Sequence, residues 1–240
     1  MTDPGNPSLP ISRRGLLRLA STKYGRSVEG AALRVWGPLR PGGLLALAGV
    51  HGEEAATVAV VSRALRSIEP DRVTASVVLC VNPDGLVYGT RGNARGVDLN
   101  RNFPTRKWRH GVIRHRWGSE AQREVELSTG EHAASEAEVA SLLALVSSLR
   151  PAVILDVHSP LAQVIDSSAT ALGRELAERL ALRLVTSNPG PEGSAGRYFA
   201  ETCQAYVNME LPHDSLISAK EEIVPCLASL LSRPVGSLVR

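Results

Sequence analysis

Short apolar runs recur along the chain, separated by amphipathic or polar segments. The segment 44–50 is apolar and bounded by glycines, and the segments 77–81 and 153–157 are of similar length and mostly apolar. Runs of this length and character are typical of strands that are buried on both faces of a sheet. Two further short strands are expected at 33–36 and 207–211.

Between the apolar runs lie segments whose apolar residues are three or four positions apart. The segment 54–68 has this spacing, and helices are also expected at 169–182 and 220–231. Another helix is expected to begin at Ser135, which forms the S-x-x-E pattern of a capping box with Glu138. Strands that alternate with helices predict an α/β protein: a single domain with a mixed, mostly parallel twisted sheet and helices on both faces.

Three segments depart from this regular alternation. Residues 86–134 are rich in Gly, Arg, Asn and His with little periodicity, so they are expected to form a long functional loop. Residues 187–196 are expected to form a Gly/Pro-rich loop. Residues 1–20 are interpreted as a partly ordered N-terminal arm, which leaves 21–240 as the main domain.

The N-terminal segment and the cysteines bear on the cellular compartment. Arg13 and Arg14 superficially resemble an export signal, but Arg18 and Lys23 interrupt the apolar stretch of about 7–15 residues that a signal peptide needs. We therefore interpret the segment as a basic helix or arm. The three cysteines are scattered and lack C-x-x-C spacing, which suits a reducing compartment. A cytoplasmic location is expected.

Composition narrows the choice of partners. The 240 residues are 43% hydrophobic and 21% charged, as in an ordinary globular protein, and the net charge is +3. That excess is too small to make nucleic acid the expected partner. No apolar run approaches the roughly 20 residues that cross a bilayer, so no membrane partner is expected either.

Reactive residues follow three of the expected strands. His51 and Glu54 follow the strand at 44–50, His158 follows the strand at 153–157, and Glu210 lies in the last strand. Ligands of open α/β sheets bind beyond the carboxyl ends of the strands. Two imidazoles and one carboxylate are a ligand set of catalytic zinc, which lowers the pKa of a bound water towards about 7. Glu210 would accept the proton of that water.

Each of these residues also has a structural interpretation. A lone histidine at a strand end is often only a hydrogen-bonded structural residue. Glu53 and Glu54 could be favourable carboxylates in the first turn of a helix, and Glu210 could be a buried ion-pair partner. We choose Glu54 over Glu53 because it completes an H-x-x-E pattern with His51. Together the residues indicate a zinc-dependent amide hydrolase with one zinc ion per chain.

Three motifs lie between the two expected zinc-ligand segments. They are Asn-Pro-Asp-Gly at 82–85, Arg-Gly-Asn at 91–93 and Gly-Val-Asp-Leu-Asn-Arg-Asn-Phe-Pro at 96–104. With H-x-x-E before them and a late His and Glu after them, they occur in the order typical of the zinc carboxypeptidase (funnelin) family. The chain resembles this family over most of its length, from the Tyr-Gly-Arg-Ser at 24–27 onwards, which implies that 21–240 is a zinc carboxypeptidase-like catalytic domain.

The resemblance implies a role for seven residues. It makes the two histidines and Glu54 the zinc ligands and Glu210 the general acid/base. It makes Arg91 the residue that polarises the scissile carbonyl and stabilises its oxyanion. Asn100 and Arg101 would bind a free carboxylate on the leaving side of the substrate, for which the planar guanidinium is well suited. Tyr198 and Tyr206 are candidates for the pocket tyrosine of digestive members.

The detailed amino-acid sequence of the motifs resembles that of a bacterial branch of the family. Its members cleave the γ-D-glutamyl–meso-diaminopimelate amide bond of murein peptides during cytoplasmic cell-wall recycling. This implies a small anionic peptide as substrate, for which the basic residues at 101–116 are either binding groups or a solvated loop. Ser159, next to the late histidine, stands where relatives can carry an acidic residue.

Three other functions stay open. The chain could be a general metallocarboxypeptidase, an acyl-amino-acid hydrolase of the desuccinylase/aspartoacylase type, or an inactive module that binds murein fragments. The Asn-Pro-Asp-Gly and full 96–104 motifs argue against the acyl-amino-acid hydrolase. No feature of the sequence decides between a monomer and a homodimer.

Overall fold

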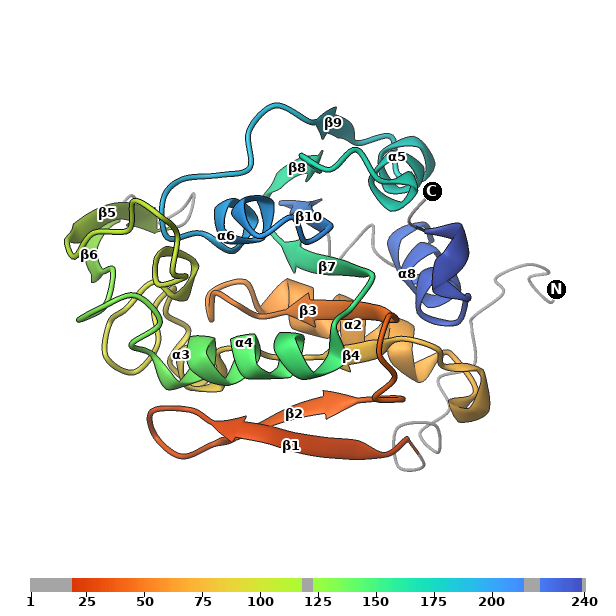
Figure 1. Ribbon diagram of the computed structural model, residues 1–240, viewed down its shortest axis with the longest axis horizontal. Helices are drawn as coiled ribbons and strands as arrows, with labels where there is room; N and C mark the ends of the chain where they lie inside the picture. The colour runs from red at the N-terminus through yellow and green to blue at the C-terminus, as the bar shows by residue number, and fades with distance from the viewer. Residues whose placement is uncertain (1–18, 118–122, 214–220, 239–240) are drawn as a thin grey trace, which may run out of the picture.

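An eight-stranded mixed sheet forms the centre of the molecule in the computed structural model, which describes residues 19–117, 123–213 and 221–238 (Figure 1). The strand order is β1-β2-β4-β3-β7-β10-β8-β9. The neighbours from β4 through β3 and β7 to β10 are parallel, as are β8 and β9, whereas the other pairs are antiparallel. The strands are β1 (Ser21–Arg26), β2 (Ala32–Trp36), β3 (Leu44–Ala48), β4 (Ser76–Val78), β7 (Val153–His158), β8 (Leu161–Ile165), β9 (Arg183–Val185) and β10 (Tyr206–Pro212).

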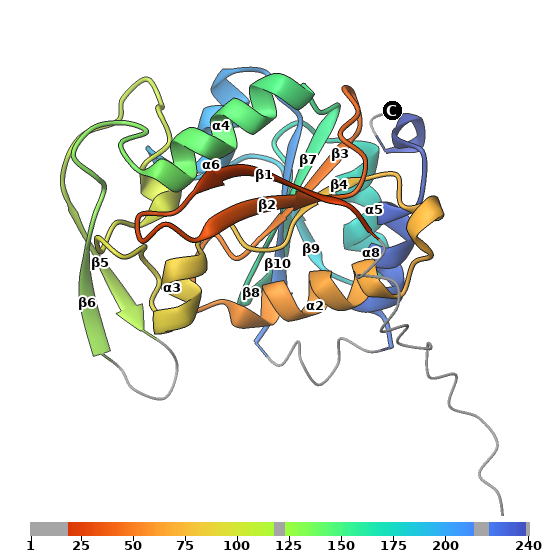
Figure 2. The same ribbon diagram turned by 90° about the horizontal axis from the view of Figure 1, so that it is seen from below.

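Helices cover both faces of this sheet (Figure 2). One face packs against α2 (Ala55–Arg66), α5 (Ala171–Arg179) and α8 (Ile223–Leu231). The other face packs against α4 (Ala137–Leu149) and α6 (Ala195–Glu201). The predicted α/β domain with a mostly parallel mixed sheet is therefore confirmed. The remaining helical turns are α3 (Pro83–Tyr88) and the 3-10 turns η1 (Pro70–Arg72), η2 (Leu99–Arg101) and η3 (Val235–Ser237).

The central strands are apolar because both of their faces are buried. All five residues of β3 are buried, and alternate residues join opposite cores: Leu44 packs toward α2, whereas Leu45 packs toward α4. Each fully buried leucine of this kind contributes roughly 1.5–3 kcal/mol. The strand ends before Gly49, whose φ of +62° is strained for other residues and turns the chain toward α2.

The segment 86–134, expected as a long loop, contains a hairpin and two helical turns. The strands β5 (Val112–Trp117) and β6 (Arg123–Ser128) pair antiparallel, apart from the main sheet. The sequence did not reveal them because they are short and rich in Arg, His and Glu. Their side chains project largely into solvent, as the exposed Arg114–Glu126 ion pair illustrates. The strands β1, β8 and β9 and helix α6 were also not expected; the first three are short and half-exposed.

The capping box expected at Ser135 does not form. Helix α4 begins at Ala137 with Glu136 as its N-cap residue, and the Ser135 hydroxyl donates to the Glu136 carboxylate. Glu138 instead accepts hydrogen bonds from the backbone N–H of Val28 and from Asn93. Tertiary partners therefore take the side chains that a local capping box would use.

The two ends of the chain agree only partly with expectation. Residues 1–18 of the expected arm lie outside the described residues. Within the expected main domain, Ser21–Arg26 forms strand β1, which pairs with β2 and was not predicted. The expected helix at 220–231 is confirmed from Ile223, and the helix expected at 169–182 ends at Arg179. Across the described residues, no helix combines the length and apolar character needed to cross a bilayer.

Candidate active site

His51, Glu54 and His158 converge at the carboxyl ends of β3 and β7. These strands are parallel neighbours, so their carboxyl ends meet at one edge of the sheet. Nδ1 of His51 lies 2.6 Å from Oε1 of Glu54, and Nδ1 of His158 lies 3.1 Å from Oε2 of the same carboxylate. One ligand atom from each residue lies within 4.8 Å of the others, and all three residues are buried. The cluster could therefore hold a metal ion.

Two buried aspartates face the far sides of the imidazoles. Oδ1 of Asp98 lies 3.3 Å from Nε2 of His51, and Oδ2 of Asp156 lies 3.1 Å from Nε2 of His158. A carboxylate at Nε2 fixes the orientation of a histidine ring and makes its other nitrogen a better ligand. Both Nδ1 atoms therefore face Glu54, as binding of one ion requires, and two imidazoles with one carboxylate fit zinc.

The electrostatics of the cluster favour the ionised form of Glu54. Burial raises the pKa of its carboxyl, but the imidazoles of His51 and His158 lower this pKa by more than burial raises it. The resulting pKa lies well below the usual range of a carboxyl group. A carboxylate is the form that binds a metal ion. Oε1 of Glu53, the other acidic candidate, instead lies 3.4 Å from Nη1 of Arg91 and 2.9 Å from Nε2 of His115. The choice of Glu54 over Glu53 thus agrees with the geometry.

Glu210 lies beside this cluster on strand β10. It pairs with His158 in the parallel register of β10 and β7, so the two side chains project from the same face of the sheet. Glu210 is 7% exposed, and its Oε2 has no hydrogen-bond partner among the described residues. Burial raises the pKa of its carboxyl, an effect that His158 partly opposes. A raised pKa suits a general base that must later return a proton.

Arg91 and the pair Asn100–Arg101 complete the site. Nε of Arg91 donates to Oδ2 of Asp98 at 2.9 Å, and the backbone N–H of Asn100 donates to Oδ1 of the same carboxylate at 2.8 Å. The Asn100 side chain accepts from the N–H of Ala195 at the start of α6. Burial lowers the pKa of the Arg101 guanidinium, and Arg91 adds to that effect while Asp98 opposes it.

A single pocket of about 410 Å³ is lined by all seven residues predicted from the sequence. The pocket also contains residues that the sequence did not single out, among them His115, Gln163 and Asn208. Of the two tyrosine candidates, Tyr206 lines the pocket and donates to Asp156, whereas Tyr198 packs against Phe103 and Phe199. His115 lies in the segment 86–134, which has little periodicity, so nothing in the sequence pointed to His115 as a pocket residue.

Asp98 and Asp156 were also missed, although the sequence holds a signal for each. Asp156 precedes His158 by two residues on a strand, which puts both side chains on one face. Asp98 lies within the 96–104 motif that carries the resemblance.

The Asn-Pro-Asp-Gly motif has a structural role outside the pocket. Its Asp84 accepts hydrogen bonds from the Ser27 hydroxyl and from the backbone N–H of Glu29.

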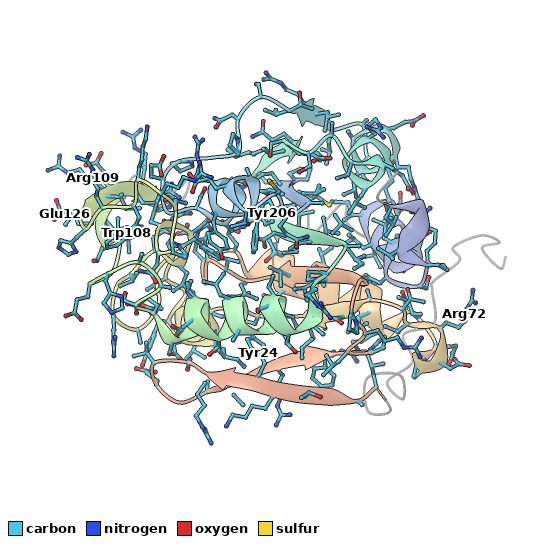
Figure 3. The ribbon with its side chains drawn as sticks, viewed as in Figure 1. Tyr24, Arg72, Trp108, Arg109, Glu126 and Tyr206 are labelled. Carbon is cyan, nitrogen blue, oxygen red and sulfur yellow. The ribbon has the colours of Figure 1, made fainter. Side chains whose placement is uncertain are left out.

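The basic segment is mostly solvated. Of its cationic residues within the described part of the chain, only Arg101 lines the pocket. Arg109 and Glu126 extend outward at the β5–β6 end of the molecule, whereas Tyr206 lies near its centre (Figure 3). The exposed cations outside the pocket lining are Arg106, Lys107, Arg109, Arg114 and Arg116.

Comparison with known proteins agrees with this fold and identifies the family. A sequence model of the zinc carboxypeptidase family matches residues 18–166, and the chain belongs to that family. It is therefore an enzyme of the metallopeptidase and amidase type. The chain is 42% identical over 229 residues to murein peptide amidase A of Escherichia coli K12, covering 92% of this chain and 93% of that protein. The corresponding protein of Vibrio campbellii is 36% identical, with 93% and 92% covered.

A solved structure gives the same result in three dimensions. The murein-tripeptide amidase of Escherichia coli O157 superposes with a TM-score of 0.82 at 39% identity. The match covers 89% of this chain and 92% of that one. The fold therefore extends over nearly the whole length of both proteins.

Proposed function

We propose that this enzyme hydrolyses the γ-D-glutamyl–meso-diaminopimelate amide bond of murein peptides, with one zinc ion per chain. The observation that carries the proposal is the meeting of the His51–Glu54–His158 cluster with Glu210 in one pocket. The relatives named murein peptide amidase, which align over nearly their whole length, support the choice of substrate. The catalytic unit in this proposal is the domain 21–240, preceded by an arm at 1–20.

His51, Glu54 and His158 would hold the zinc ion through two Nδ1 atoms and the carboxylate. When bound, zinc lowers the pKa of water towards about 7 and so supplies a nucleophile at neutral pH. Glu210 accepts the proton of the attacking water and passes it to the departing amine of diaminopimelate. Attack of the water forms the carbon–oxygen bond and converts the carbonyl into a tetrahedral oxyanion. Collapse of this species breaks the carbon–nitrogen bond, and the proton from Glu210 goes to the amine, giving a free γ-carboxyl group and a free amine.

The cationic residues of the pocket bind the charges of the substrate. Arg91 donates to the oxygen that becomes negative in the transition state, where a preorganised donor is most effective. Asn100 and Arg101 bind the carboxylate on the leaving side, as a planar fork of N–H donors allows. These roles match a small anionic peptide. The proposal includes cytoplasmic cell-wall recycling, which the three free cysteines support because disulfides are uncommon in reducing compartments.

The test is the zinc content of the purified protein together with its action on L-Ala-γ-D-Glu-meso-diaminopimelate. We expect about one zinc per chain and release of free diaminopimelate, identified by mass spectrometry. The matched control is Glu210→Gln, which should keep zinc but lose turnover by a factor on the order of 100 to 10,000.

Other outcomes would point elsewhere. Zinc without cleavage of this peptide, but with activity on C-terminal L-amino acids or on N-acyl amino acids, would favour one of the alternative hydrolases. Absence of zinc after loading would show that the three residues are not the ligands. Near-normal activity of Glu210→Gln would remove Glu210 from the mechanism.

A further inference from the structure

Strand β10 presents a line of polar side chains on the face that bears Glu210. Tyr206, Asn208 and Glu210 alternate along the strand, so all three project from the same face, and all three line the pocket. The mechanism uses only Glu210. The other two extend the pocket along the strand, away from the zinc-ligand cluster.

This extension lies next to the leaving-side carboxylate site. Asn100 accepts from the N–H of Ala195 at 2.8 Å. The residue after Ala195, Gly196, has no room for a side chain, because an added Cβ would meet the ring of Tyr206 at 3.4 Å and the backbone oxygen of Pro189 at 2.3 Å. The Tyr206–Asn208 end of the pocket therefore adjoins the pair that binds the substrate carboxylate. A leaving-side residue held there would direct its side chain toward Asn208.

Asn208 offers a hydrogen-bond acceptor at this end. Its Nδ2 donates to Oε1 of Glu210 at 3.4 Å, which identifies the nitrogen end of the amide, since the reverse assignment would put two acceptors face to face. Its Oδ1 is buried and, among the described residues, has no donor. Because the terminal torsion of asparagine is broad, the amide can turn its oxygen toward an entering donor.

A carboxylate lies beside Asn208 on the neighbouring strand. Asn208 pairs with Asp156 in the parallel register of β10 and β7, and adjacent strands are about 4.8 Å apart. Oδ2 of Asp156 accepts from the Tyr206 hydroxyl at 2.7 Å, whereas its Oδ1 has no hydrogen-bond partner within the described part of the chain. Asp156 is fully buried and is not among the residues that line the pocket, so it contributes negative charge next to Asn208 rather than a contact with a ligand. An amide acceptor with a carboxylate beside it favours a cationic donor with several N–H groups.

We propose that Asn208, with Asp156 beside it, forms a subsite that recognises an ammonium group on the side chain of the leaving residue. Resting on the proposed function, this inference assigns the subsite to the distal amine of meso-diaminopimelate. Asn208 would then be a specificity-determining residue that contacts the substrate. A side chain without an amine would leave the Asn208 acceptor unsatisfied, which is how a polar site rejects an apolar or shortened analogue.

The test compares two tripeptides that differ only in this amine. One is L-Ala-γ-D-Glu-meso-diaminopimelate, and the other has 2-aminopimelate in the last position, which keeps the distal carboxylate but has hydrogen in place of the distal amine. For the zinc-loaded wild type, kcat/KM should be at least about tenfold higher for the diaminopimelate peptide, as expected for a hydrogen bond to a charged group. Asn208→Leu should reduce this preference to about twofold or less.

The ratio of the two kcat/KM values is the readout because it cancels any effect that a variant has on Glu210 itself. Asn208→Ala is a second variant that removes the same acceptor without adding bulk. The matched control is Gln163→Leu, which removes another amide from the same pocket and should keep the preference.

Three results would overturn the inference while leaving the proposed function intact. These are a wild type that cleaves both peptides equally well, Asn208 variants that keep the full preference, and a preference lost in Gln163→Leu instead. Cleavage of neither peptide by zinc-loaded wild type would overturn the proposed function, and the inference with it.

Discussion

Asp98 binds Arg91 through an Nε–Oδ2 hydrogen bond of 2.9 Å, and the same carboxylate faces His51 through its other oxygen at 3.3 Å. One fully buried side chain thus orients a candidate zinc ligand and the candidate oxyanion-binding arginine together. It also accepts from the backbone N–H of Asn100, which lies in the turn η2 and is a candidate for binding the substrate carboxylate. Burial raises the pKa of Asp98, but His51 and Arg91 lower it more, so the side chain is ionised.

Asp98→Asn should weaken zinc binding and catalysis together. The amide cannot accept from Arg91 and face His51 with a negative charge at once, and loss of such an outer partner typically costs about 10–100-fold in metal affinity or activity. Chelator competition measures the zinc affinity, and kcat/KM is measured at saturating zinc. The matched control is Asp84→Asn, a buried aspartate outside the pocket, which should lower thermal stability but leave zinc affinity unchanged. Unchanged zinc affinity in Asp98→Asn would contradict this role.

The pH dependence of kcat/KM should report Glu210. As a general base Glu210 works in the ionised form, and burial raises its pKa above the ordinary value of about 4.3. Activity is therefore expected to be complete above the raised pKa and to fall as the pH decreases through it. The acid limb should lie above pH ~4.3 and be missing from the residual activity of Glu210→Gln. Zinc content measured at each pH separates this limb from loss of the metal; a limb at or below pH ~4.3 would refute the assignment.

Gly193→Ala should disturb the substrate-carboxylate site as well as stability. Gly193 has a φ of +77°, and an added Cβ would meet the backbone oxygen of Arg101 at 2.2 Å. Left-handed backbone costs alanine roughly 1–2 kcal/mol, and displacement of Arg101 adds to it. We expect a higher KM for the tripeptide and a lower unfolding midpoint.

The control for that prediction is Gly42→Ala. Gly42 has a similar φ of +74°, but an added Cβ there would meet nothing within 4 Å. It should show only the stability loss that comes from the backbone conformation. Equal KM values in the two variants would mean that the Gly193 loop does not position Arg101.

The three cysteines should differ sharply in their reaction with iodoacetamide. Burial raises the pKa of the Cys80 thiol to about 12, and burial also raises the pKa of Cys226, whereas Cys203 is exposed. Because the thiolate is the reactive form, native protein at pH 8 should be alkylated first at Cys203. Peptide mapping by mass spectrometry identifies the site, and denatured protein, in which all three react, is the control. Rapid alkylation of Cys80 in the native protein would contradict the packing described for this region.

The sequence alone was sufficient for the fold class and for the seven candidate residues that meet in the central pocket. The apolar runs behind β3 and β7 were readable because both faces of these strands are buried, so nearly every residue carries the signal. The hairpin β5–β6 was not readable, because its strands are half-exposed and charged and are defined by their pairing with each other. The capping box at Ser135 failed for a related reason, since distant partners took the side chain of Glu138.

Within the site, whether the sequence could predict a contact between two residues depends on how far apart they lie along the chain. His51 and Glu54 are three residues apart, so their spacing alone predicts that they can meet. The meeting of His158 with Glu210, and of Asp156 with Asn208, depends on the register of β7 against β10. Register is set by packing of the whole sheet, and a shift by one residue would turn every one of these side chains to the opposite face. Only the tertiary structure could therefore decide which carboxylates and amides surround the candidate zinc ligands.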